Sequence, residues 1–157
     1  RVKFGSSSAQ TITATGDPTA SSAFDPIATS DACKTITAES TPGTAVYTYR
    51  SHGFTMLGLP TVTATIGTTG DWGELASQLF DVMPDGSERL ISRGAYRLTD
   101  NQTGQITFQL HGNGYYFPNG DEVKLVLLGS DAPYLRKSNN PAFTVQVSKL
   151  TVSLPTR

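Results

Sequence analysis

Two histidines, His52 and His111, are the residues of this chain best suited to act as a catalytic base or a metal ligand. Neither has a second histidine or a cysteine at the spacing that a zinc site uses, and His111 falls on the polar face of a predicted strand. Ser51 precedes His52, but Tyr49 stands where a Gly-x-Ser-x-Gly nucleophile motif needs its first glycine. We therefore predict no catalytic residue and no metal site, and we interpret both histidines as structural or exposed.

The carboxylates are plentiful, but each stands at or beside a predicted turn, where an aspartate accepts hydrogen bonds from backbone amides. The residues concerned are Asp81, Asp85, Asp100, Asp121, Glu122 and Asp131. The run from Asp81 to Asp85 lacks the alternating acidic pattern of an EF-hand loop. No cofactor is predicted, and a calcium ion at one edge of the domain stays open as an alternative.

Four aromatic side chains are candidates for binding a ligand, namely Trp72, Tyr115, Tyr116 and Tyr134. Trp72 stands alone in a polar break between Gly70 and Gly73. Such rings stack on sugars or anchor an interface, and they equally fold down to cover the end of a β domain. Both interpretations stay open for all four residues.

A long polar loop follows the most apolar strand pattern of the chain. Residues 123–128 are apolar on both faces once Lys124 is passed, as a strand buried from two sides is, and the pattern breaks at Gly129. Asp131, Asn139 and Asn140 lie in the loop, and their short polar side chains are suited to bond backbone groups within it. We predict that these three residues hold the loop in place.

The chain from residue 44 onward alternates apolar and polar residues with a period of two, as at residues 62–66 (VTATI). Pro84-Asp85-Gly86 separates two strand patterns as a hairpin turn does, and a change of parity at Ser148-Lys149 predicts a bulge. About eight short strands and no helical period indicate an all-β fold, a two-sheet antiparallel sandwich of the jelly-roll type. Arg93 and Arg97 fall on the outer face of one strand, where we expect them to pair with neighbouring acids.

Residues 1–43 differ from the rest because they are rich in serine, threonine, alanine and proline. We interpret them as an extended segment that wraps over the domain, anchored by Phe24, Ile27 and Ile36, or as a linker from something upstream. Residues 44–157 then make up the sandwich domain.

The charge balance excludes some partners. The 157 residues carry a formal net charge of −1 at pH 7, so we expect neither a nucleic acid nor an anionic membrane as partner. No apolar run approaches the roughly 20 residues of a membrane helix, and the first residues lack the apolar centre of a signal peptide. We interpret a chain that begins at Arg1 as a fragment, and leave its location open, with a secreted parent as one alternative. The single cysteine, Cys33, is interpreted as a small buried side chain or a surface thiol, or as one that pairs with a cysteine outside this chain.

Several short motifs follow one another in a specific order: TMLGLP at 55–60, LFDVMPDG at 79–86, SRGAYR at 92–97, FPNG at 117–120, and GSDAPY at 129–134 followed by Ser138-Asn139. In order and spacing they resemble the C-terminal domain of X-prolyl dipeptidyl peptidases and of their relatives, the cocaine-esterase-like acyl hydrolases. The resemblance covers roughly residues 44–155. One departure is Asp121, where the family pattern has a histidine after the glycine.

The resemblance implies a galactose-binding-like jelly roll that packs beside an α/β-hydrolase domain, which holds the serine, aspartate and histidine of the reaction. Two functions follow. The chain is either a non-catalytic accessory domain of an X-Pro dipeptidyl peptidase or esterase, shaping its substrate cleft, or a free-standing carbohydrate-binding module that uses Trp72 and the tyrosines. An autonomous enzyme is disfavoured, because no nucleophile has a recognisable base partner.

Overall fold

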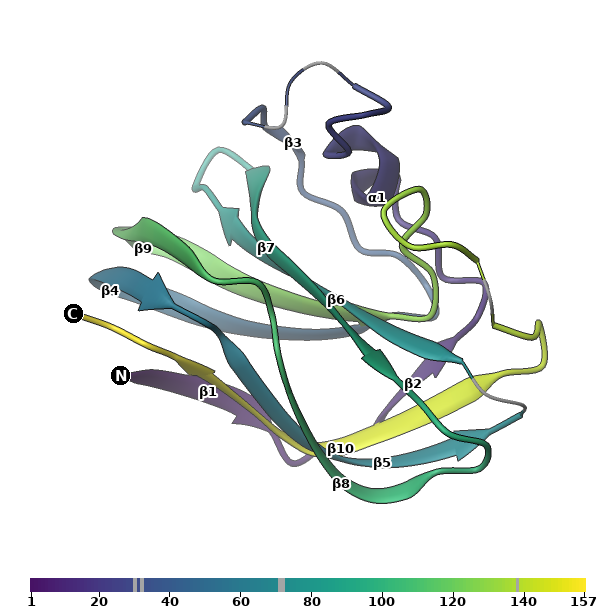
Figure 1. Ribbon diagram of the computed structural model, residues 1–157. Helices are drawn as coiled ribbons and strands as arrows, with labels where there is room; N and C mark the ends of the chain where they lie inside the picture. The colour runs from purple at the N-terminus through teal and green to yellow at the C-terminus, as the bar shows by residue number, and fades with distance from the viewer. Residues whose placement is uncertain (30, 32, 71–72, 138) are drawn as a thin grey trace.

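The computed structural model describes residues 1–157 except 30, 32, 71, 72 and 138. In the described part of the chain, ten strands form two five-stranded antiparallel sheets that face each other across an apolar core (Figure 1). The predicted all-β, two-sheet antiparallel sandwich is confirmed. The predicted count of about eight strands is low, because the N-terminal segment contributes short strands of its own.

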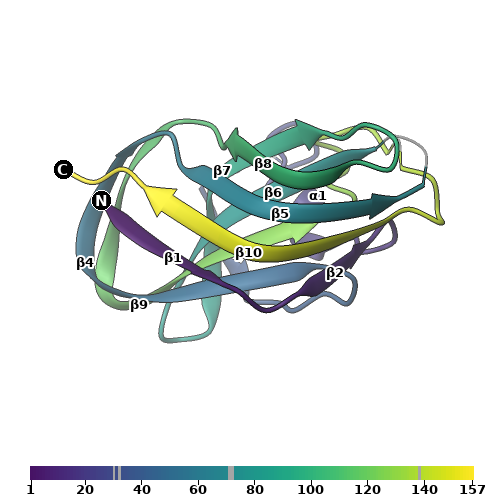
Figure 2. The same cartoon turned by 90° about the horizontal axis from the view of Figure 1, so that it is seen from below.

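The first sheet has the order β1-β10-β5-β8, with β2 also paired to β10 (Figure 2). Its strands are β1 (Val2–Ser6), β2 (Gln10–Thr13), β5 (Thr61–Thr69), β8 (Thr103–Gln109) and β10 (Thr144–Leu154). The register between β10 and β5 shifts between Ser148 and Thr151, which confirms the predicted bulge.

The second sheet has the order β3-β7-β6-β9-β4. Its strands are β3 (Ile36–Thr37), β4 (Ala45–Gly58), β6 (Glu74–Val82), β7 (Ser87–Arg97) and β9 (Asn113–Leu128). The turn between β6 and β7 is closed by a 3.0 Å hydrogen bond from Gly86 N to Met83 O, with Gly86 at a φ of +83°. This confirms the predicted hairpin, since glycine adopts positive φ without strain.

Residues 123–128, the second half of β9, are buried on both faces, as their sequence predicts. Leu125 and Leu127 belong to the core between the sheets, whereas Val126 and Leu128 pack on the outer face of the second sheet. That outer face carries a second apolar cluster, which includes Phe80 of β6 and Phe24, just after the short helix α1 (Thr19–Ala23). The helix therefore covers the second sheet from outside.

The N-terminal segment is built into this architecture. Strands β1 and β2 pair with β10, β3 pairs with β7, and α1 lies on the second sheet. Phe24 is buried and Ile36 packs beside it, but Ile27 is 96% exposed, so the prediction that Ile27 anchors the segment is wrong. The Asp25 carboxylate accepts hydrogen bonds from the amides of Ile27 and Ala28, a local turn that leaves the Ile27 side chain in solvent. None of the described helical residues forms a helix long and apolar enough to cross a membrane.

Candidate functional site

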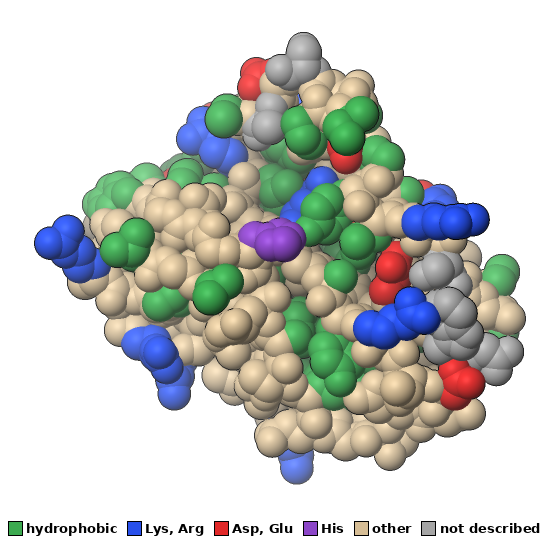
Figure 3. Space-filling model, in the orientation of Figure 1, with side chains coloured by type: hydrophobic (Ala, Val, Ile, Leu, Met, Phe, Trp, Pro, Cys, Tyr) green, Lys and Arg blue, Asp and Glu red, His purple; other side chains and the backbone are tan. Residues whose placement is uncertain are grey.

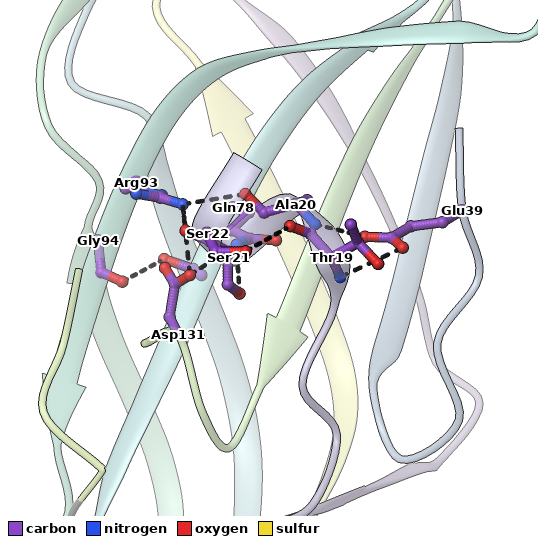
Figure 4. Close-up of polar contacts among 10 residues, drawn as sticks. Thr19, Ala20, Ser21, Ser22, Glu39, Gln78, Arg93, Gly94 and Asp131 are labelled. Carbon is purple, nitrogen blue, oxygen red and sulfur yellow. Dashed lines mark hydrogen bonds and ion pairs between the residues drawn. The ribbon is translucent and has the colours of Figure 1, made fainter. Parts of the chain in front are cut away.

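Polar side chains lie buried where α1 and the loop at 129–143 meet the second sheet (Figure 4). Gln78 of β6 and Arg93 of β7 are cross-strand partners, and both reach Asp131 at the start of the loop. Gln78 Nε2 donates to Asp131 Oδ1 at 2.7 Å, and Arg93 Nη2 lies 3.5 Å from the same oxygen. Asp131 is fully buried, so this ion pair ties the loop to the sheet away from water.

The same arginine holds the helix. Arg93 Nη2 donates to the backbone oxygens of Ser21 at 2.7 Å and Ala20 at 3.3 Å, and Gln78 Nε2 lies 3.2 Å from Ser21 Oγ. The last carbonyls of a helix lack partners within the helix, and a cation there is favourable. Arg93 therefore joins helix, sheet and loop at one point. Its predicted pairing with an acid is confirmed, although helix and loop bury it.

A second buried ion pair lies near the other end of α1. The Glu39 carboxylate accepts hydrogen bonds from the amides of Ala20 at 2.8 Å and Thr19 at 3.3 Å, so it caps the helix. Lys124 Nζ of β9 donates to Glu39 O at 3.1 Å and forms a buried ion pair with Glu88 of β7. Both termini of the helix are thus bonded to groups outside it.

Burial sets the electrostatics of these carboxylates. It raises the pKa of Asp131, a change opposed by the charge of Arg93 and by hydrogen bonds from Ser21 and Gln78. Burial likewise raises the pKa of Glu88, opposed by its hydrogen bond and charge interaction with Lys124. The two ion pairs, with the hydrogen bonds around them, join the helix and the loop to the second sheet, and the removal of their charges from water opposes this stabilisation.

The predicted loop residues are well bonded. Asn139 Oδ1 accepts from the amide of Glu74 at 2.7 Å, and its Nδ2 donates to Glu74 O at 2.9 Å and to Gly129 O. Asn140 Oδ1 accepts from the amide of Ala142 at 3.0 Å. Asp131 differs from the expectation, because its carboxylate bonds the Gln78 and Arg93 side chains of the sheet and not loop amides. Gln78 was not predicted, and its signal in the sequence is a long amide inside the apolar strand of residues 75–82.

A shallow groove lies beside this network (Figure 3 shows a hollow on this face, bordered by a histidine and apolar side chains). Tyr134 covers Arg93, with 4.9 Å from the arginine Cζ to the ring centre, and its hydroxyl lies 2.5 Å from His111 Nε2. The groove is lined by Phe24, Pro26, Leu90, Ile91, Ser92, Arg93, His111, Gly112, Asn113 and Tyr134. Of the predicted binding residues that the structure describes, only Tyr134 lines it.

The hydroxyl groups next to histidines are committed to other partners. Ser92 Oγ donates to the backbone oxygen of His111 at 2.7 Å, while the imidazole is bonded to Tyr134. Ser51 Oγ donates to Phe117 O at 3.1 Å. Among the residues that the structure describes, no three His, Cys, Asp or Glu side chains are grouped so as to hold a metal.

Tyr115 and Tyr116 do not line the groove. Tyr115 packs edge-on against Phe117 at 4.9 Å, and its hydroxyl donates to Asp81 Oδ2 at 2.6 Å. Burial and the nearby Asp81 carboxylate raise the pKa of Tyr115 to about 12. Tyr116 is 58% exposed. Trp72 lies outside the described residues. The structure therefore does not bring the three tyrosines together.

Two of the acids predicted to cap turns are buried inside strands instead. Asp81 lies in β6 and Asp121 in β9, at exposed fractions of 1% and 5%. Burial raises the pKa of Asp81, the hydrogen bond from Tyr115 opposes this, and the charge of Asp121 adds to it. The prediction is wrong for both because the strands run further than their sequence patterns indicate. Asp85, in contrast, caps its turn by accepting from the Ser87 amide at 2.9 Å.

Solved structures show where this fold recurs. A CocE/NonD family hydrolase from Staphylococcus aureus matches 99% of this chain and 34% of its own, with 10% identity and a TM-score of 0.60. An α-amino acid ester hydrolase matches 71% of this chain and 25% of its own, with 22% identity and a TM-score of 0.56. An aminopeptidase from a marine-sediment Thaumarchaeota archaeon gives the same coverage, with 12% identity and a TM-score of 0.55.

These identities establish likeness of fold alone, and the chain spans a quarter to a third of the length of these proteins. No curated protein matches this sequence. The model of one family, described as the X-Pro dipeptidyl-peptidase C-terminal non-catalytic domain, matches residues 6–153. The chain therefore belongs to the family of X-Pro dipeptidyl-peptidase C-terminal non-catalytic domains.

Proposed function

We propose that this chain is the accessory β-sandwich domain of an X-Pro dipeptidyl-peptidase-like or esterase-like protein, in which it packs beside an α/β-hydrolase domain and forms one wall of the substrate cleft. The match of residues 6–153 to a non-catalytic domain carries the proposal. The names of the similar structures support it, since an ester hydrolase, an aminopeptidase and a CocE/NonD hydrolase all contain this fold as a minor part of a longer chain.

The geometry of the site supports a role as a fixed surface. The loop at 129–143 and helix α1 are both tied to the second sheet by buried ion pairs and hydrogen bonds. A loop that is bonded in this way loses little freedom when a partner binds it, which favours association. A rigid, non-catalytic domain is suited to complete the wall of a cleft whose catalytic groups lie in another domain.

The three candidate tyrosines, as the structure describes them, do not favour the carbohydrate-binding alternative. A sugar platform needs rings that lie exposed on one surface. Tyr115 faces the core, Tyr134 is bonded to His111, and only Tyr116 has most of its surface exposed. A titration with oligosaccharides, followed by the fluorescence of the single tryptophan, tests this alternative directly.

The proposal is tested in the longer protein that contains residues 1–157. We expect its reading frame to encode an α/β-hydrolase domain, with activity towards X-Pro-nitroanilides or short-chain nitrophenyl esters. Deletion of this domain should then change KM and kcat together, because one wall of the cleft is removed. A frame without a hydrolase domain, or kinetic constants unchanged by the deletion, would contradict the proposal.

A further inference from the structure

We propose that one end of the sandwich, where β4 finishes and β9 begins, is the surface that docks the α/β-hydrolase domain. This inference rests on the function proposed above and adds the place of contact. The surface consists of Leu57, Leu59 and Tyr116, and we refer to it as the β4–β9 tip. Three observations support this proposal: the exposure of these side chains, the absence of charged residues from the segments that carry them and the position of the chain ends.

The tip exposes apolar side chains that a folded domain normally covers. Leu57 is 59% exposed, Leu59 is 48% exposed and Tyr116 is 58% exposed. They are three of the four large apolar side chains exposed among the described residues. Contiguous apolar surface of this kind marks interaction sites, whereas single exposed leucines are normal.

The pairing of β4 with β9 places Leu57 and Tyr116 together, and Leu59 follows directly after the end of β4. Leu57 lies opposite Gly114 and Tyr116 lies opposite Thr55, so Leu57 and Tyr116 project from the same face of the strand pair. Glycines leave the leucines uncovered. A Cβ at Gly114 would lie 3.4 Å from Leu57 Cδ1, and one at Gly112 would lie 3.6 Å from Leu59 Cδ2. Gly112 also lines the groove beside Tyr134, so tip and groove are continuous.

Charged residues are missing from the segments that build the tip. The sequence contains no Asp, Glu, Lys or Arg from residue 53 to 70 or from 101 to 120. Depletion of charge is the compositional mark of the buried centre of an interface. The same segments also supply the outer face of the first sheet, but that face presents threonine and glutamine, which water satisfies. Of these two surfaces, the tip is the one whose removal from water is favourable, because it is apolar.

The chain ends lie at the same end of the sandwich as the tip. Val2 pairs with Leu154, and Leu57 N donates to Pro155 O at 2.9 Å, so both ends of the chain adjoin the end of β4. Figures 1 and 2 show the two termini close together beside β4. The family is a C-terminal domain, so in its members the catalytic domain comes first. A domain joined ahead of Arg1 therefore starts next to the tip.

Hydroxyl-radical footprinting of the longer protein tests the surface at the level of side chains. We expect Leu57, Leu59 and Tyr116 to be oxidised at least 5-fold more slowly than their exposed fractions in this structure predict. Ile27, the fourth exposed apolar residue, serves as the matched control and should react fast. Fast oxidation at the tip together with protection at Ile27 or on the outer face of the first sheet would overturn the docking surface while leaving the accessory function standing.

Variants separate docking from folding. In the longer protein with a protease site placed ahead of Arg1, the two halves should stay together on gel filtration after cleavage. Leu59→Ser with Tyr116→Ser should release this domain, whereas Ile27→Ser should not. An unchanged melting temperature of the released domain shows that it has not unfolded. Retention of the double variant, a dimer of this chain held by the tip, or a parent without a hydrolase domain would each overturn the proposal, and the last alone would also remove the proposed function.

Discussion

The outer faces of the two sheets are both formed by every second residue of their strands, but they differ in their exposure to solvent. The first sheet turns threonine, serine and glutamine to solvent, for example Thr63 and Thr107, whose hydroxyls lie 3.1 Å apart. Part of the outer face of the second sheet is covered by α1 and the loop that follows β9, with two ion pairs enclosed beneath them. The outer face of the first sheet is thus hydrated by water, whereas that of the second sheet depends on the helix and the loop that pack on it.

This difference predicts where substitutions will destabilise the fold most. Hydroxyls on an open face exchange protein partners for water at little cost, so their replacement matters little. Charges that are buried beneath a cover have no water to replace a lost partner, so breaking one pair is strongly destabilising. The loop and helix that shape the groove therefore depend on a few buried polar groups of the second sheet.

The largest effect is expected at Asp131. Asp131→Ala leaves Arg93 buried without its counter-charge and Gln78 without one of its two acceptors, which should lower the free energy of unfolding by about 3–5 kcal/mol. Urea denaturation measures the loss. Asp17→Ala, which breaks the exposed pair of Asp17 with Lys137, is the matched control and should cost less than about 1 kcal/mol. Equal effects of the two variants would mean that the covered face is no different from an open one.

A second prediction concerns the pair of Lys124 and Glu88. Lys124→Met should destabilise by about 3 kcal/mol because it strands the Glu88 carboxylate. Adding Glu88→Leu should recover most of the loss, since a buried ion pair exchanged for apolar groups of similar volume is close to neutral. Thermal and urea unfolding of the single and double variants decide this. If the double variant were less stable than Lys124→Met alone, Glu88 would stabilise the fold by an interaction other than its ion pair with Lys124.

The pH dependence of stability should follow the buried acids. Burial raises the pKa of Asp81, Glu88 and Asp131, so the folded chain keeps protons that the unfolded chain releases. Stability should therefore fall as pH rises from the ordinary carboxyl pKa through the raised one, by at most about 1.4 kcal/mol per pH unit for each proton. Asp81→Asn should flatten the decline, as measured by unfolding midpoints from pH 4 to 8. A steeper decline in the variant would contradict the assignment.

The smallest effect is expected on the open face. Thr63→Val removes a hydroxyl that water can replace and keeps a β-branched side chain, so the free energy of unfolding should change by less than about 0.5 kcal/mol. The same unfolding assay applies. A loss comparable to that of Asp131→Ala would show that the open face also depends on its side-chain hydrogen bonds.

The fold was predictable because its signals are local. The alternation at residues 62–66, the turn at 84–86 and the bulge at Ser148-Lys149 all lie within single strands or hairpins, and the structure has each of them. Helix α1 was not predictable from periodicity, because five residues make too few turns to show one. Ile27 was misjudged since apolar character alone does not reveal a local turn that leaves a side chain outside.

The site was predictable only in part because its contacts join distant segments. Asn139 and Asp131 were identified as residues that hold the loop, but the partner of Asp131 depends on β7 lying beside β6. Arg93 was expected on an outer face, and nothing in its own strand indicates that a helix covers that face. The tyrosines share a residue type and differ in environment, which follows from the register of β9 and the path of the loop.

We propose that this domain contributes surfaces and no reacting group of its own. Labelling of residues 1–157 with a fluorophosphonate serine probe, beside assays with X-Pro-nitroanilide and nitrophenyl esters, tests it most directly. We predict no stoichiometric labelling and no turnover that a serine-directed inhibitor abolishes, because Ser51 and Ser92 are bonded to backbone oxygens. Turnover that persists through purification and disappears with stoichiometric labelling of one serine would contradict the account.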